Sequence, residues 1–137
     1  MALPADDKIR KRIRPFQGFI AYFPDAVALV ALLSKIANEQ HNPGEPMHWA
    51  KEKSPEELDS LMNHVIDIAA KGELSMDSDG MLDAVKVAWR ANANLQRLAD
   101  KYGGAAGLIS LMNKQEITVA AAVQLDTHTE GEKQCGD

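Results

Sequence analysis

The spacing of apolar residues along the chain predicts three helices. The first follows Pro24-Asp25, where proline suits a first helical turn, and runs to about Gln40. The second runs to about Lys71 with i, i+3, i+4, i+7 spacing, and the third ends at Gly103-Gly104. The apolar positions are Val27, Leu29, Val30, Leu32, Leu33 and Ile36 in the first helix; Leu58, Leu61, Met62, Val65, Ile66 and Ala69 in the second; and Leu82, Val85, Trp89, Leu95 and Leu98 in the third.

Polar motifs mark where the helices begin. Ser54-Pro55-Glu56-Glu57 is typical of an N-cap, a proline at the first helical position and a glutamate that completes a capping box, which explains Glu57 as a cap. Asp77-Ser78-Asp79-Gly80 precedes the third helix. Beyond Gly104 the pattern weakens: residues 105–113 could form a short fourth helix, and residues 117–125 a strand or a helix.

The composition favours an all-α fold. The chain has 137 residues, of which 45% are apolar and only 5% aromatic, and strand-like alternation is scarce. We therefore expect one helical-bundle domain over residues 16–125, with a basic arm over residues 1–15 and a disordered tail over residues 126–137.

Charge and cysteine content narrow the functional classes. A formal charge of -5 argues against a main role on a nucleic-acid backbone, since phosphate neutralisation needs surplus Lys and Arg. The single cysteine, Cys135, excludes an intrachain disulfide and a thiolate metal site. No apolar stretch reaches the ~20 residues of a membrane span, and no signal-peptide pattern occurs at the start. We expect a cytoplasmic protein with no membrane or nucleic-acid partner.

The N-terminal region departs from this acidic average. Residues 8–14 form a basic run, which is either a solvated arm or an anion-binding arm for the phosphates of a small substrate. With prolines at positions 4 and 15, the arm is expected to be extended. Residues 16–23 concentrate aromatics, and we expect that segment to be buried, at an interface or against a base.

Three carboxylates are candidates for metal binding. Glu56 and Asp59 share one flank of the second helix and could hold one hard cation such as Mg²⁺, although acidic residues also suit a first helical turn. Glu39 lies near the C-terminal end of the first helix, where the dipole disfavours an anion, so it needs a cation nearby. If the two helices pack antiparallel, these three carboxylates lie close together.

The third helix carries a second polar line. Asp83, Lys86 and Arg90 are spaced at i, i+3 and i+7, which suits one extra metal ligand and two phosphate-neutralising cations. The alternative is an exposed row with an internal ion pair.

The loop over residues 41–49 combines polar groups with one of the two tryptophans. A zinc site built from His41, His48 and His64 is an alternative, although no cysteine helps and the spacing matches no finger. An HNH-type nuclease is weaker still, because the strand context is missing. With Lys51 and Lys53 at its exit and a helix N-terminus next, the loop suits anion binding better.

The chain resembles the phage dATP/dGTP diphosphohydrolases, including the MazZ type, within the MazG-like all-α nucleoside triphosphate pyrophosphohydrolases. The resemblance covers about residues 14 to 98. It is carried by Phe23-Pro24-Asp25-Ala26, by Asn38-Glu39-Gln40-His41-Asn42-Pro43-Gly44 with His48-Trp49, and by Lys86-Val87-Ala88-Trp89-Arg90.

The family pattern is E-x-x-E on one helix and E-x-x-D on the next. Glu39 matches the second Glu, and Glu56 and Asp59 match the E-x-x-D, but Ile36 stands where the first carboxylate is expected. The phage subfamily often has His at the positions of Glu57 and Asp83, and Arg at that of Asn63. These departures suggest that Asp83 supplies the missing carboxylate.

The resemblance implies metal-dependent hydrolysis of a purine deoxynucleoside triphosphate, dGTP or dATP, to the monophosphate, and for the MazZ type a supply of dGMP for 2-aminoadenine synthesis in a modified phage genome. Glu39, Glu56 and Asp59, with Asp83, would hold Mg²⁺ or Mn²⁺. Substrate would be bound by Asn42, Lys53, Lys86 and Arg90, with Trp49 or an N-terminal aromatic stacked on the base. A unit this small has little concave surface, so we expect a homodimer or homotetramer that completes the site. The rival hypothesis is a non-catalytic helical protein that binds a partner through its basic arm and aromatic segment.

Overall fold

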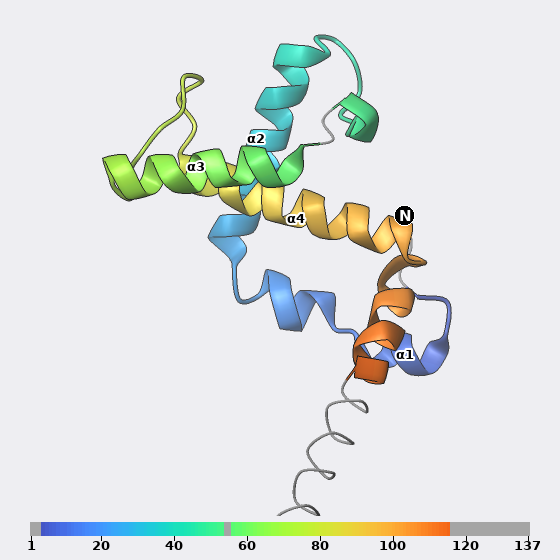
Figure 1. Cartoon of the computed structure of the whole chain (residues 1–137). Coiled ribbons are helices and arrows are strands. Elements are labelled where there is room, and N and C mark those ends of the chain that lie inside the picture. The colour runs from blue at the N-terminus through green and yellow to red at the C-terminus, as the bar shows by residue number, and fades with distance from the viewer. Residues whose placement is uncertain (1–3, 54–55, 116–137) are drawn as a thin grey trace, which may run out of the picture. The chain divides into compact units, whose positions relative to one another are not determined.

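The regular structure of the chain is helical. The computed structural model describes residues 4–53 and 56–115. Within them the only pairing of β type is a single bridge between Met76 and Leu82, so the all-α prediction is confirmed for this part of the chain (Figure 1). The elements are α1 (Asp7–Arg12), a π-helical turn η1 (Phe16–Ile20), α2 (Pro24–His41), a 3₁₀ turn η2 (Lys51–Lys53), α3 (Glu57–Lys71) and α4 (Asp83–Lys101).

The chain divides into two compact units, and each is described by itself. The larger unit spans Lys11–Leu98, and the smaller one combines Met1–Arg10 with Ala99–Asp137. The larger unit contains all the individual residues that the sequence predicted to bind metal or substrate, whereas the first part of the basic run, residues 8–10, belongs to the smaller unit.

The bounds of α2 agree with the prediction. Pro24 lies in its first turn, where no intrahelical hydrogen bond is lost. The helix ends at His41, and the Asn42 N–H donates to the Asn38 carbonyl oxygen at 2.8 Å. Pro43 and Gly44 then prevent a further turn.

The start of α3 differs from the predicted capping box. Its N-cap is Glu56, whose side chain makes no capping hydrogen bond, and Glu57 is the first helical residue rather than the third. Ser54 and Pro55, the predicted cap and first residue, lie outside the described residues. The interpretation of Glu57 as a cap is therefore wrong. The end of α3 at Lys71 was predicted correctly.

A tight loop joins α3 to α4. The Gly80 N–H donates to the Asp77 carbonyl oxygen at 2.9 Å, and the Asp83 N–H donates to the Ser75 carbonyl oxygen at 2.9 Å. Gly80 has a φ of 80°, in the left-handed region that favours glycine. The loop reverses the chain, so that α3 and α4 run antiparallel (Figure 1).

A small apolar core joins α2 to α4. Leu33 from α2, Met81 from the loop and Val85 from α4 are buried. The indole N–H of Trp89 donates to the Ser34 hydroxyl at 2.9 Å, which satisfies the polar edge of a half-buried ring. Partly buried apolar residues complete the core: Val30, Ile36, Leu82 and Trp89. In Figure 1, α2 crosses the pair formed by α3 and α4.

Most of the apolar stripe of α3 lies on the surface. Such a stripe ordinarily faces a core, but Leu58, Met62, Val65 and Ile66 are 60%, 49%, 37% and 58% exposed. The buried side of α3 instead presents Glu57 and His64 to α4. The second half of the apolar face of α4 is also exposed, at Leu95 and Leu98.

The N-terminal arm contains a helix where an extended chain was expected. In α1 the Asp6 carboxylate accepts hydrogen bonds from the Lys8 and Ile9 N–H groups at 2.8 and 3.1 Å, which is an N-cap arrangement. No single helix among the described residues has the length and apolarity to cross a membrane; one bent pair of segments, Asp7–Ile20 with Pro24–His41, meets those criteria only jointly.

The C-terminal part of the smaller unit starts at Ala99, in the last turn of α4, and contains the two glycines that were predicted to end this helix. α4 ends at Lys101, and Gly103 and Gly104 both have positive φ. Residues 104–115 are helical, in agreement with the short fourth helix suggested for residues 105–113. A Cβ on Gly107 would lie 1.8 Å from the Tyr102 carbonyl oxygen, so this position requires glycine. The predicted segment 117–125 and the tail 126–137 lie outside the described residues.

Replacement of Leu33 by alanine tests the core. Leu33 is 8% exposed, and Leu33→Ala is expected to lower the free energy of unfolding by about 2–4 kcal/mol, because it removes buried methyl groups and leaves a cavity. Urea unfolding followed by far-UV circular dichroism measures the change. Leu74→Ala, at a residue 72% exposed, is the matched control and should cost less than about 0.5 kcal/mol. Equal effects of the two variants would contradict this assignment of the core.

Candidate functional site

The three predicted metal-binding carboxylates are exposed. Glu39 lies in the last turn of α2, its side chain 65% exposed and one carboxylate oxygen 3.9 Å from the Lys35 ammonium. The Lys35 ammonium supplies the nearby cation that a carboxylate at a helix C-terminus requires. Glu56 and Asp59 lie at the start of α3, and within the described residues their side chains have no hydrogen-bond or ion-pair partner.

The structure does not gather these carboxylates into one cluster. In the described part of the chain, the only group of three or more potential metal ligands within 4.8 Å of one another is His64, Asp77 and Asp83. We expected α2 and α3 to pack antiparallel, whereas Figure 1 shows α2 crossing α3. A metal site at Glu39, Glu56 and Asp59 stays a prediction.

Asn38 organises the loop that follows α2. Its buried side-chain amide donates to the Glu45 carbonyl oxygen at 3.1 Å, and its amide oxygen accepts from the His48 N–H at 3.3 Å. The Asn42 amide also donates to this oxygen, at 3.5 Å. Asn42, assigned above to the substrate, therefore has a structural contact within the loop.

Trp49 connects this loop to α4. Its ring meets the Trp89 ring edge to face, with centroids 5.5 Å apart and planes at 76°. The Lys51 ammonium lies 5.1 Å and the Arg97 guanidinium 5.8 Å from the Trp49 ring centroid. Trp49, predicted to stack on a base, is thus half-buried and packed against protein groups, while Lys53 is exposed.

The buried carboxylate of Glu57 joins α3 to α4. Glu57 is 2% exposed; one carboxylate oxygen accepts from Arg90 Nη1 at 2.7 Å, and the other lies 3.7 Å from Arg97 Nε. Arg97 also donates to the Lys51 carbonyl oxygen. Arg90, predicted to neutralise phosphate, is therefore paired with a carboxylate. Sequence reasoning missed Arg97, although its i+7 spacing from Arg90 places both guanidiniums on one face of α4.

Lys86 is also paired within the protein. Its ammonium lies 2.5 Å from a carboxylate oxygen of Asp77 and 2.6 Å from one of Asp79, both in the loop before α4. The hydrogen bond from Lys86 lowers the pKa of Asp77 to about 2. Burial opposes the charged form of Lys86, but the bonds to both aspartates outweigh it and raise its pKa. A phosphate bound by Lys86, as predicted from the sequence, would have to compete with Asp77 and Asp79 for its ammonium group.

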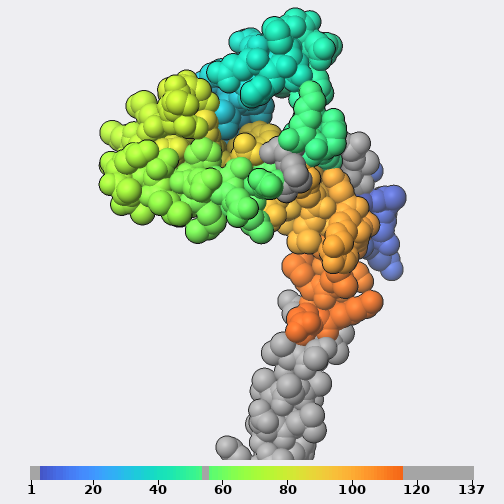
Figure 2. Space-filling view, turned by 45° about the horizontal axis from the view of Figure 1, so that its top comes forward, coloured from blue at the N-terminus to red at the C-terminus, as the bar shows by residue number. Residues whose placement is uncertain are grey.

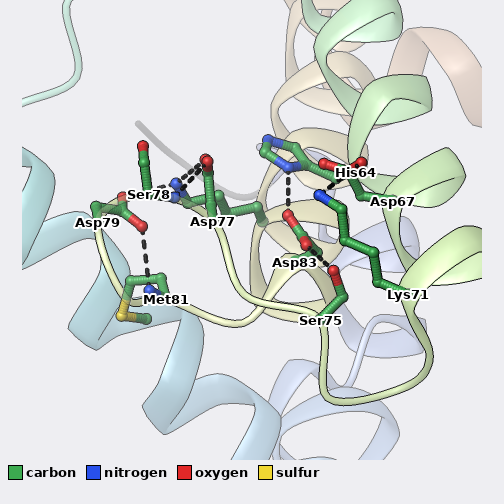
Figure 3. A network of polar contacts seen from close by, with 10 residues as sticks. His64, Asp67, Lys71, Ser75, Asp77, Ser78, Asp79, Met81 and Asp83 are labelled. Atoms are coloured by element: carbon green, nitrogen blue, oxygen red, sulfur yellow. Dashed lines mark hydrogen bonds and ion pairs between the residues drawn. The ribbon is translucent and has the colours of Figure 1, made fainter.

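Asp83 lies at the centre of the polar network in Figure 3. It is 0% exposed, and its carboxylate accepts from the Ser75 hydroxyl at 2.5 Å and contacts His64 Nδ1 at 2.8 Å. The Ser75 hydrogen bond and then the His64 contact hold the pKa of Asp83 below its usual value, against the effect of burial. We expected Asp83 to join Glu39, Glu56 and Asp59, whereas its neighbours are His64 and Asp77.

This network is closed on itself. In a catalytic Ser-His-Asp triad the histidine lies between the serine and the aspartate and bonds to both. Here Ser75 and His64 both contact the carboxylate of Asp83, and no hydrogen bond joins Ser75 to His64, so the three side chains do not form such a triad. Asp77 has its cation in Lys86. A zinc site of His41, His48 and His64 is absent from the described residues, where His48 Nδ1 contacts the Pro46 carbonyl oxygen. The network fixes the loop between α3 and α4.

Comparisons of the chain with protein-family models, with curated proteins and with solved structures found no match.

Glu57→Gln tests the buried ion pair. The variant removes the charge of a carboxylate that is 1% exposed and that contacts the guanidiniums of Arg90 and Arg97. We expect a loss of about 3 kcal/mol in the free energy of unfolding, since removal of one partner of a buried pair leaves an uncompensated charge. Glu73→Gln, at an exposed glutamate beyond the end of α3, is the control. A Glu57→Gln protein as stable as the control would rule out this role.

The pKa of Asp77 generates a pH-dependence prediction. Because the folded-state pKa is lowered from 3.8 to about 2, the ion pair with Lys86 stabilises the fold above pH 4, and this contribution is lost as the pH falls toward 2. An NMR titration of the aspartate carboxyl carbons should give Asp77 a midpoint near 2. In Lys86→Met the midpoint should return toward 3.8. A midpoint that is the same in both proteins would contradict the pairing.

Proposed function

We propose that the chain is a metal-dependent nucleoside triphosphate pyrophosphohydrolase of the MazG-like type, acting on purine deoxynucleoside triphosphates. The observation that carries the proposal is the contact of Trp49 with Trp89 at 5.5 Å. These rings belong to two of the three segments that carry the resemblance, one after α2 and one in α4, which lie far apart in the sequence. Their contact supports the reading of both segments as parts of one site.

The loop geometry adds support. Asn38, the first residue of the Asn38–Gly44 motif, is buried and bonds to the backbone of Glu45 and His48. The Asn38 side chain therefore holds the loop in place, while the carboxylate of Glu39, the next residue in the chain, remains exposed. A fixed loop beside an exposed carboxylate suits substrate binding.

The donor set of Glu39, Glu56 and Asp59 fits a hard divalent cation. Three exposed carboxylates offer the oxygen ligands that Mg²⁺ or Mn²⁺ takes, and two of them have no partner within the described residues. When bound, the metal would polarise the α-phosphate and lower the pKa of an attacking water. The chain needs such a cation because its charge of -5 would otherwise repel a triphosphate.

The cationic residues of the predicted site differ in whether they are already paired with carboxylates. Lys53 is exposed and is our first candidate for a phosphate contact. Lys86 and Arg90 have carboxylate partners, so we assign them to the stability of the loop and of the α3–α4 pair. Asp83 has the same kind of role through His64 and Ser75.

A homodimer or homotetramer would complete the site. Glu39 is not clustered with Glu56 and Asp59 within one chain, so a metal that needs all three donors would draw some of them from a second copy. Shared sites of this kind occur at symmetric interfaces.

One observation favours the rival function. Phe16, Tyr22 and Phe23 are 67%, 71% and 50% exposed, and the rings of Phe19 and Phe23 meet at 5.7 Å. The aromatic segment is therefore not buried within the larger unit. This would suit an interaction protein that uses the segment to bind a partner.

Nucleotide hydrolysis by the full chain separates the two functions. The four ribonucleoside and four deoxyribonucleoside triphosphates are each tested with Mg²⁺, Mn²⁺ or chelator, and products are separated by chromatography. We expect dGTP or dATP to yield the monophosphate only when metal is present. Glu39→Gln, Glu56→Gln and Asp59→Asn should each reduce turnover by about 100-fold or more, which is ~2.7 kcal/mol of transition-state stabilisation.

Glu73→Gln is the matched control for these variants, because it removes an exposed charge outside the proposed site. Circular dichroism verifies that each variant keeps its helices. Undiminished turnover in Glu56→Gln and Asp59→Asn would exclude the metal assignment, and no hydrolysis under any condition would favour the interaction protein.

A further inference from the structure

A group of apolar side chains lies exposed in the segment before α2. We call it the apolar patch and define it by five residues of the larger unit: Phe16, Phe19, Ile20, Tyr22 and Phe23. Their exposed fractions range from 40% to 71%. The ring of Phe23 meets those of Phe19 and Tyr22 edge to face, with centroids 5.7 and 6.2 Å apart. Three of the rings therefore form one apolar surface, which marks an interaction site.

The chain directly before the patch is basic. No acidic residue occurs between Asp7 and Asp25, whereas five basic ones do: Lys8, Arg10, Lys11, Arg12 and Arg14. Arg12 and Arg14 are exposed and belong to the same unit as the patch. The Arg14 guanidinium donates to the amide oxygen of Gln17 at 3.0 Å, and this neutral partner does not compensate its charge. The surroundings of the patch are thus positive in a chain whose formal charge is -5.

We propose that the apolar patch inserts into the interfacial region of an anionic lipid bilayer, with Arg12 and Arg14 at the lipid headgroups. Exposed aromatic rings beside Lys and Arg are typical of segments that lie in the membrane–water interface. Burial of the rings provides attraction to any bilayer, and the cations restrict strong binding to anionic surfaces. This inference does not depend on the hydrolase activity.

Binding at the surface agrees with the length of the segment. Among the described residues no single helix can cross a membrane, and the bent pair that contains this segment meets the criteria only jointly. We expected no membrane partner because no apolar stretch reaches the length of a span. A segment that lies in the interface needs no such stretch, and its binding is reversible.

A single-stranded nucleic acid fits the patch less well. Such strands stack their bases on the faces of aromatic rings, whereas Phe23 already packs against Phe19 and Tyr22 at interplanar angles of 62° and 84°. Rings in mutual contact offer few free faces. A lipid interface accepts apolar groups in any orientation, because hydrophobic attraction is non-directional.

The exposed apolar residues of α3 have different electrostatic surroundings. α3 lies toward the viewer in Figure 2, in green and yellow-green. Leu58 and Met62 are 60% and 49% exposed, but the acidic residues Glu56 and Asp59 lie at the start of this helix. An anionic bilayer would repel them. α3 therefore provides apolar residues of similar exposure that should not bind lipid.

Sedimentation of the full chain with lipid vesicles tests the proposal. Vesicles of an equimolar mixture of phosphatidylglycerol and phosphatidylcholine should carry the protein into the pellet, and vesicles of phosphatidylcholine alone should not. Arg12→Gln combined with Arg14→Gln should weaken binding by about 10-fold or more, and so should Phe16→Ser combined with Tyr22→Ser. A wild-type protein that does not bind the anionic vesicles at low salt would overturn the proposal.

Two double variants are the matched controls. Lys35→Gln combined with Lys71→Gln removes the same charge at lysines whose side chains are 68% and 57% exposed. Leu58→Ser combined with Met62→Ser removes exposed apolar side chains of α3. Both should bind like the wild type, and a loss equal to that of the patch variants would contradict the assignment. Binding of a single-stranded oligonucleotide without binding of vesicles would identify a nucleic acid as the partner and refute the proposal.

A fluorescent probe distinguishes insertion of the patch from adsorption by charge alone, and it does not depend on the stability of the double variants. Cys135 is the only cysteine, so Phe16→Cys in a Cys135→Ser background accepts one polarity-sensitive dye. Its emission should shift to the blue when anionic vesicles are added, whereas the same dye at Leu58→Cys should not shift. Equal shifts at both positions, or no shift at Phe16→Cys, would exclude insertion of the patch.

Discussion

The ion pairs of Glu57 with Arg90 and Arg97 are the constraint on which the rest of the larger unit depends. They hold the first turn of α3 on α4, and Arg97 extends the contact to the backbone at Lys51 and to the ring of Trp49. The position of Glu56 and Asp59 follows from this anchor, because they flank Glu57 in the chain. Buried charges cost desolvation, so such a pair contributes more to a defined geometry than to net stability.

A second polar contact sets the register of the two helices. His64 is seven residues beyond Glu57 on α3, and its partner Asp83 is seven residues before Arg90 on α4. Two polar side-chain contacts seven residues apart on each helix define a single antiparallel alignment, since a shift by one turn would break both. Ser75 and the pair of Lys86 with Asp77 then fix the loop between the helices.

The sequence predicted the helices well and the tertiary contacts poorly. The bounds of α2, the end of α3 and the end of α4 depend on proline, glycine and apolar spacing, which act locally. Glu57 was misread because a capping box explains it from its neighbours alone, whereas its partner Arg90 is 33 residues away. Lys86 and Arg90 were assigned to a ligand for the same reason: pairing with Asp77 or Glu57 depends on how α3 and α4 pack. The exposure of Met62 and Ile66 is likewise a tertiary property that periodicity cannot reveal.

The contact between Trp49 and Trp89 has an optical consequence. The chain contains two tryptophans, and both lie at the junction of the loop after α2 with α4. All of the tryptophan emission of the protein therefore originates at this junction. An event that moves the loop away from α4 changes the surroundings of both indoles at once, so the molecule carries its own fluorescent reporter of loop position.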